Sequence, residues 1–263
     1  MSSLPRSARI LVTRPRHQAE SLCRLIRERG AIAVPFPVLE IEPIPQPQAP
    51  REVLSRLESF DWVFFISANA VNFALLANNG RIAKPKAVQF AAIGKATAKA
   101  LRKAGLDVDL LPENGFTSEA LLATAQLQNL QGSSCLIVRG QGGRELLGDT
   151  LRFRGASVSC LEVYRRLKPV ADPGEVQRQL SEGLVQASIV TSGEALQNLL
   201  EMLGDEAASL LRSIPLVVIS GRMEALAAAK GFKVIAVSEP ADAAIIETVT
   251  ELINGEQRGR RIE

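Results

Sequence analysis

Histidine, cysteine and aromatic residues are scarce in this chain of 263 residues, and each scarcity excludes a class of site. Because His17 is the only histidine, a metal centre with several histidine ligands is excluded, and a histidine-based catalytic triad would have to use that residue. The three cysteines, Cys23, Cys135 and Cys160, show no CxxC spacing, which argues against structural zinc or a disulfide framework and favours a reducing cytoplasm. Aromatic residues make up only 4%, so the stacking surfaces of single-stranded nucleic-acid binders are scarce.

Long apolar runs and a strong net charge are also lacking. No run approaches the roughly 18 to 20 apolar residues of a membrane span, and the apolar stretch near the N-terminus is too short for a secretory signal. We therefore expect a cytoplasmic protein without a membrane partner. With 31 Lys and Arg against 28 Asp and Glu, the chain is mildly basic, which fits a small anionic ligand at least as well as nucleic acid.

Short apolar runs alternate with amphipathic stretches of helical length, a pattern typical of βαβ proteins. The runs that predict strands span 9–13, 62–67, 89–93, 108–111, 135–139, 188–192, 216–220 and 233–237. The stretches that predict helices span 17–29, 51–59, 68–77, 95–104, 118–127, 143–154, 174–182, 194–203, 222–230 and 241–253. Runs such as VFFI at 63–66 have no polar alternation, so they indicate parallel strands that helices bury on both faces, and the fold class is α/β.

An internal repeat indicates two similar α/β halves. A shift of 125 residues superposes 9–31 on 134–156, Arg14 on Arg139, and Ser67 on Ser192. Two extended, proline-bounded segments, 34–50 and 158–173, stand at matching positions of the repeat and are predicted to connect the halves, because proline disfavours helices and central strands. The residues leave open whether the halves follow one another in tandem or exchange their first βα unit.

Small polar or basic residues follow most of the predicted strands. Ligands of open parallel sheets bind beyond the carboxyl ends of the strands, where the first N–H groups of the helices have no partner and carry positive potential. The residues that we predict to bind an anionic substrate there are Thr13, Arg14, Ser67, Ala68, Asn69, Gly94, Lys95, Thr97, Arg139, Gly140, Thr191, Ser192, Gly193, Ser220, Gly221 and Arg222. Each can also be explained as a helix cap or a turn, but six such sites in two related halves favour a binding cleft.

Four other features carry weaker signals. The turn RGQGGRELL at 139–147 resembles a glycine-rich phosphate cradle, but it lacks the third glycine of GxGxxG, and no P-loop motif occurs. His17 fits a surface or capping residue better than a base, and Glu40 and Glu42 fit a solvated strand face better than an acid/base pair. Tyr164 is the only tyrosine and precedes two arginines; a phenol can donate a proton to a leaving group, although it can equally be an ordinary strand residue.

Taken in order, several motifs resemble those of uroporphyrinogen-III synthases. They are LVTRP at 11–15, FISANAV at 65–71, IGKATAKAL at 93–101, IVRGQGGRELL at 137–147, EVYRR at 162–166 and IVTSGEAL at 189–196. The resemblance implies two similar parallel-sheet α/β domains joined by a two-stranded antiparallel β connector, with the first domain discontinuous. Residues 1–35 and 168–263 would then form domain 1 around an inserted domain 2 at 40–160, with connector strands at 34–45 and 158–168.

The resemblance also implies an activity that needs no cofactor or metal. The family's enzymes are lyases that close hydroxymethylbilane, a linear tetrapyrrole with eight carboxylates, to uroporphyrinogen III, with inversion of ring D and loss of water, on the way to heme and siroheme. By motif match, Tyr164 would assist departure of the hydroxyl. The implied ligand contacts are Ser67, Thr97, Arg139, Thr191 and Ser192. Near the C-terminus, Ser220 and Met223 stand where the family pattern has Gly and Thr, which weakens the expectation for that turn.

The expected partners follow from this activity, and three alternatives compete with it. The partners are the linear tetrapyrrole and, as a candidate neighbour, hydroxymethylbilane synthase, with no nucleic acid or membrane, and the chain is expected to be a monomer. One alternative is a non-catalytic two-domain protein that binds a small anion. The others are a nucleotide-dependent enzyme that uses the turn at 139–147, and a nucleic-acid binder that uses the basic tail at 258–261.

Overall fold

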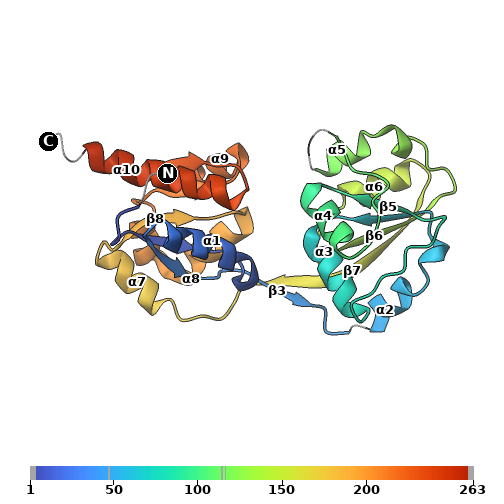
Figure 1. Ribbon diagram of the computed structural model, residues 1–263, viewed down its shortest axis with the longest axis horizontal. Helices are drawn as coiled ribbons and strands as arrows, with labels where there is room; N and C mark the ends of the chain where they lie inside the picture. The colour runs from blue at the N-terminus through green and yellow to red at the C-terminus, as the bar shows by residue number, and fades with distance from the viewer. Residues whose placement is uncertain (1–3, 47, 114, 116, 260–263) are drawn as a thin grey trace. The chain divides into compact units, whose positions relative to one another are not determined.

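The structure is a computed structural model that describes residues 4–46, 48–113, 115 and 117–259. The chain divides into two compact units (Figure 1): unit 1 is Met1–Glu40 with Leu167–Glu263, and unit 2 is Ile41–Arg166. The chain passes between the units twice, within strand β3 (Glu40–Pro43) and near the end of strand β7 (Ser157–Leu167). Unit 1 is therefore discontinuous, which answers the question that the repeat left open.

Unit 1 is built on a sheet of five parallel strands. In order across the sheet, these are β10 (Ile235–Val237), β9 (Leu216–Val218), β8 (Val185–Ile189), β1 (Arg9–Val12) and β2 (Ile32–Pro35). Strand β1 lies between β2 and β8, so the N-terminal segment of the chain and its C-terminal part together form one sheet. Pro35 lies in β2 at the sheet edge, where a missing N–H is tolerated.

Helices cover both faces of this sheet, as the unbroken apolar runs predict. Ile10 and Val12 of β1 pack with α1 (Arg16–Glu28) and α10 (Asp242–Gly259). Leu11, which points to the other face, packs with α7 (Gly174–Ser181), α8 (Gly193–Leu211) and α9 (Gly221–Ala229). The two clusters of buried side chains make unit 1 a three-layer α/β sandwich.

Unit 2 has the same architecture. Its strand order is β3, β7, β6 (Ser134–Gly140), β4 (Trp62–Phe65) and β5 (Gln89–Ala92), and the last four strands run parallel. One face is covered by α2 (Gln48–Leu54), α3 (Ala68–Ala77) and α4 (Lys95–Lys103), and the other by α5 (Ser118–Leu122) and α6 (Leu146–Phe153). Short 3-10 turns lie at Leu57–Ser59 and Ala125–Leu127. Strand β3 lies next to β7: Glu42 forms an ion pair with Arg165, and just beyond β3 the Ile44 N–H donates to the Val163 carbonyl, contacts whose order along the two segments is that of antiparallel neighbours.

The internal repeat is visible in the strand orders. Under the shift of 125 residues, β2-β1-β8-β9 of unit 1 corresponds to β7-β6-β4-β5 of unit 2, strand by strand and in the same spatial order. The segment that comes first in the chain for unit 1 comes last for unit 2. The units are thus not tandem copies, because each unit combines segments from both halves of the sequence.

Some sequence-based expectations for single elements are wrong. Residues 108–111 form no strand: they make one isolated bridge between Ala91 and Leu110, and the Asp109 carboxylate accepts a hydrogen bond from the Phe90 N–H. Pro50, in a segment where proline was expected to exclude helix, lies in the first turn of α2, where its missing N–H costs nothing. The connector segment 158–168, by contrast, stays a prediction; it overlaps β7, whose residues up to Tyr164 pair with β6.

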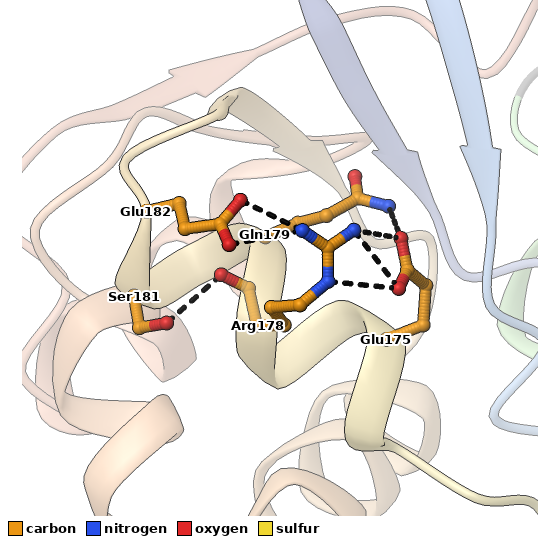
Figure 2. A network of polar contacts seen from close by, with 5 residues as sticks. All are labelled: Glu175, Arg178, Gln179, Ser181 and Glu182. Atoms are coloured by element: carbon orange, nitrogen blue, oxygen red, sulfur yellow. Dashed lines mark hydrogen bonds and ion pairs between the residues drawn. The ribbon is translucent and has the colours of Figure 1, made fainter.

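Helix α8 differs most from its predicted length. The sequence pattern predicts a helix over 194–203, but the helical run continues to Leu211 across a break at Gly204, whose φ of 73° and ψ of 170° are not helical. Helix α7 lies beside it and carries a polar network (Figure 2): Arg178 donates to Glu175 and Glu182, and the buried Gln179 donates to Glu175. The hydrogen bond from Arg178 lowers the pKa of Glu175. These pairs, three and four residues apart, stabilise a short helix.

Candidate functional site

The predicted site residues lie at the carboxyl ends of parallel strands in each sheet, and several of them follow the central strands. In unit 2 the chain connections change direction between β4 and β6. Ser67 comes shortly after β4, and Arg139 and Gly140 are the last residues of β6. In unit 1 the change lies between β1 and β8, which are followed by Thr13 and by Thr191 with Ser192. Open α/β sheets bind ligands at such switch points, because the diverging connections leave room beyond the strand ends.

Three predicted serines cap helices. The Ser67 hydroxyl accepts a hydrogen bond from Ala70 N–H at 2.9 Å, and Ser192 and Ser220 do the same at the starts of α8 and α9. A capping hydroxyl uses a lone pair in this bond, so its own O–H can still donate. The structural explanation and the functional one are therefore compatible at these positions.

The remaining predicted residues occupy the same helix starts or the strand ends. Gly94 is the N-cap of α4, while Thr97 is buried inside the first turn of that helix. The residues that lie in first helical turns are Ala68, Asn69, Lys95, Gly193, Gly221 and Arg222. Thr13 is fully buried, and its hydroxyl donates to the Ile189 carbonyl at 2.8 Å, so this side chain joins β1 to β8.

The two arginines that the repeat aligns are both paired with carboxylates. Arg14 Nη1 lies 2.5 Å from Oδ1 of Asp242, and Arg139 pairs with Glu145 at 2.8 Å and with Glu162 at 3.6 Å. Burial lowers the pKa of Arg139, but the hydrogen bond and the charge of Glu145 outweigh this effect and hold the pKa above its ordinary value. An incoming carboxylate would have to share or replace these partners. The Nε of Arg139 is buried and has no hydrogen-bond partner in the described part of the chain.

Tyr164 lies at the switch point of unit 2, although the sequence placed it in a connector. Its hydroxyl is 3.2 Å from Ser67 Oγ, and its ring packs on Phe73 of α3 with 5.5 Å between ring centroids. The residue is only 5% exposed and belongs to the core cluster of that face. Sequence reasoning missed Phe73, which stands on the buried side of α3, six residues beyond Ser67.

The other motifs form no comparable constellation. His17 is exposed in the first turn of α1 beside Gln18, and Glu42 is paired with Arg165 at 3.1 Å. Glu145, in the glycine-rich turn, faces Arg139 rather than an open cradle. Of the basic tail at 258–261, the side chains and the last two residues lie outside the described part of the chain.

A cavity of about 560 Å³ in unit 1 contains none of the predicted residues. It lies between α7 and the break in α8, and Arg178, Asp205 and Leu210 are among its lining residues. Over residues 4–46, 48–113, 115 and 117–259, no three His, Cys, Asp or Glu side chains come together as metal ligands would. None of the helices in that part of the chain is both long and apolar enough to span a membrane.

Comparison with known proteins gives one consistent result. The family model described as Uroporphyrinogen-III synthase HemD matches residues 20–247. The chain is 37% identical to the uroporphyrinogen-III synthase of Escherichia coli K12 and 39% identical to that of Salmonella typhimurium LT2, in each case over 89% of this chain and 96% of the relative.

Two solved structures share the fold. A mutant uroporphyrinogen III synthase from the extremely thermophilic bacterium Thermus thermophilus matches with a TM-score of 0.65 and 20% identity, over 97% of this chain and 100% of that one. A uroporphyrinogen-III synthetase from Helicobacter pylori 26695 matches with a TM-score of 0.59 and 17% identity, over 93% and 99%.

Proposed function

The chain belongs to the uroporphyrinogen-III synthase family, and from this membership we propose which of its residues carry out the family's reaction. The protein is a lyase that closes hydroxymethylbilane to uroporphyrinogen III, a step of porphyrin biosynthesis. Loss of the hydroxyl from the first ring gives an azafulvene cation, which the substituted carbon of the last ring attacks. The resulting spiro intermediate fragments and recloses with that ring inverted. Because the substrate supplies both reacting carbons, the protein has mainly to hold and orient them.

The substrate carboxylates bind at the helix starts of both units. Support comes from the capping hydroxyls of Ser192 and Ser220, which retain an O–H donor at the starts of α8 and α9, and from the positive end of α3, the helix that Ser67 caps. Arg14 and Arg139 add positive charge next to these starts. Thr13 is the weakest member of the predicted set, because its hydroxyl already donates to Ile189.

Tyr164 donates a proton to the departing hydroxyl. The observation that carries this assignment is the position of its hydroxyl at the switch point of unit 2, 3.2 Å from Ser67 Oγ and beside the start of α3. A phenol there can give up its proton while the positive end of the helix stabilises the charge left on its oxygen.

The domain assignment made from the sequence, 1–35 with 168–263 and 40–160, is supported by the chain's crossing points at 40/41 and 166/167. The connector strands at 34–45 and 158–168 contain both crossings. We also infer that the chain works as a monomer in the cytoplasm, next to the hydroxymethylbilane synthase that supplies its substrate. Three free cysteines are consistent with a reducing compartment.

The test is the isomer formed from enzymatically generated hydroxymethylbilane. Spontaneous closure gives isomer I, so isomer III above the blank measures catalysis. The Tyr164→Phe variant is expected to lower kcat by about 100-fold or more, the usual contribution of a positioned proton donor, with KM little changed. Unchanged turnover in a folded Tyr164→Phe variant would remove the phenol from the mechanism, and a product mixture equal to the blank would refute the activity itself.

A further inference from the structure

The Tyr164 hydroxyl has a polar neighbour in Ser67, whose Oγ lies 3.2 Å away. Ser67 Oγ accepts the Ala70 N–H, so its own hydrogen is free to donate to the phenolic oxygen. If it does, the phenol O–H has no internal acceptor in this pair and can point to a substrate. The serine therefore fixes both the position of the tyrosine oxygen and the direction of its proton.

A β-bulge brings Tyr164 to this serine. Arg139 pairs with Glu162, but the next residue, Gly140, pairs with Tyr164, so that Val163 is the extra residue of β7. Val163 and Tyr164 both join the core cluster that packs under α3, which consecutive residues of a regular strand cannot do. The Gln141 N–H then donates to the Tyr164 carbonyl at 2.8 Å and closes the bulge.

Gly140 provides the space for the phenol. A Cβ built on Gly140 would overlap ring atoms Cε2 and Cζ of Tyr164 and stand 2.9 Å from its hydroxyl. A side chain at this position would force the phenol ring or the Gly140 backbone to move. The bulge, the bare backbone of Gly140 and the Phe73 ring together leave Tyr164 one place to lie, with its oxygen at the serine.

We propose that Ser67 is the positioning residue of Tyr164, donating to its oxygen so that the phenol proton goes to the substrate and the phenolate that remains is stabilised. This inference rests on the proposed function. In the step, the phenol O–H bond breaks, its proton joins the departing hydroxyl, the C–O bond breaks and water leaves. The ring carbon that finally closes the macrocycle loses its hydrogen as a proton, which restores the phenol, so the sum is the loss of one water.

The repeat supplies a comparison within the same chain. Ser192 is the counterpart of Ser67 and caps α8 through the same bond, at 3.1 Å. The chain has one tyrosine, so Ser192 has no phenol to position. A serine at a helix start is thus common to both units, whereas the contact with a phenol belongs to unit 2.

The experiment is a double-mutant cycle on the full chain. Isomer III formation is measured for wild type, Ser67→Ala, Tyr164→Phe and the double variant. We expect Ser67→Ala to lower kcat about 10-fold, the effect of one hydrogen bond to a group that becomes charged, and to have almost no effect on kcat when Tyr164 is already Phe. Ser67→Thr, which keeps the hydroxyl, is expected to restore kcat to within about threefold of wild type.

Two controls separate positioning from helix capping. Thr117 caps α5 in the same unit, where its Oγ1 accepts the Ala120 N–H at 3.2 Å. Thr117→Ala removes this cap and is expected to lower thermal stability without changing kcat. If Ser67→Ala does not fold, Ser67→Gly serves in the same cycle, because glycine is tolerated as an N-cap.

Each outcome has one meaning. If Ser67→Ala lowers activity by the same factor in both backgrounds, or acts through KM alone, Ser67 contacts substrate and the inference is wrong while the proposed function stands. If Tyr164→Phe is fully active, the phenol has no role and the inference falls with it. If wild type forms no isomer III above the blank, the proposed function fails and the inference fails as its consequence.

Discussion

Cys135 lies in the middle of the unit 2 sheet, Cys23 on the inner face of α1, and Cys160 on the exposed side of β7. Burial, with a smaller effect from Asp61, raises the pKa of the Cys135 thiol to about 12, and burial also raises the pKa of Cys23. Only a thiolate reacts with disulfide reagents, and a thiol with a pKa of about 12 stays protonated at pH 8.

These thiols can be distinguished by titrating the native protein with an aromatic disulfide at pH 8. We expect one fast equivalent per chain, at Cys160, and three after denaturation. Cys160→Ser should remove the fast equivalent. Fast reaction of two or three thiols in the native state would mean that the cores around Cys23 and Cys135 open readily, which would contradict their burial.

At the scale of single residues, the sequence predicted which side chains stand at strand ends but not what they touch. The motif match placed Ser67 and Tyr164 in the site. Their contact depends on a β-bulge in β7, which the pattern of residue types does not predict. The pairing of Arg139 with Glu162 depends on the register of β6 and β7 in the same way. Contacts between residues far apart in the chain follow from register, and register is fixed by packing rather than by local sequence.

Among the elements, helix starts were predicted better than helix ends. Serine N-caps and glycines after the last turn are local signals, and Ser67, Ser192 and Ser220 cap the helices that the sequence indicates. The continuation of α8 to Leu211 was missed because a glycine at 204 is usually a stop signal. Gln177 of α7 donates to the Leu203 carbonyl at 2.9 Å, a tertiary contact that satisfies the broken turn.

The break in α8 gives a prediction at this scale. Gly204 has φ 73° and ψ 170°, a conformation open almost only to glycine, and its Cβ would meet no atom within 4 Å. Gly204→Ala is therefore expected to cost about 1–3 kcal/mol of stability through backbone strain alone. Thermal unfolding measures this loss of stability. Gly221→Ala is the matched control, since a Cβ at Gly221 would also meet no atom within 4 Å but the residue has no left-handed φ. Equal stability of the two variants would show that the strain is absent.

On the scale of the whole molecule, the repeat produces two similar units, but the single tyrosine of the chain lies in only one of them. The strand orders correspond, and Ser67 and Ser192 cap equivalent helices, so each unit has a capping serine at its switch point. Only unit 2 adds Tyr164. The sequence predicted the repeat and the α/β class because both rest on local periodicity, whereas the discontinuity of unit 1 could be inferred only from the resemblance to a family.

This asymmetry predicts a division of labour that kinetics can separate. A donor that only holds a carboxylate stabilises the bound substrate and the transition state equally, so its loss raises KM and leaves kcat unchanged. Ser192→Ala is therefore expected to raise KM about 5-fold, the value of one hydrogen bond near 1 kcal/mol, with kcat within about twofold of wild type. Ser67→Ala should do the reverse and lower kcat. Both variants lose a helix cap of the same kind, so a shared loss of stability cannot produce opposite kinetic effects. If Ser192→Ala instead lowers kcat as strongly as Ser67→Ala, unit 1 takes part in the chemical step, and the assignment of proton donation to unit 2 alone is wrong.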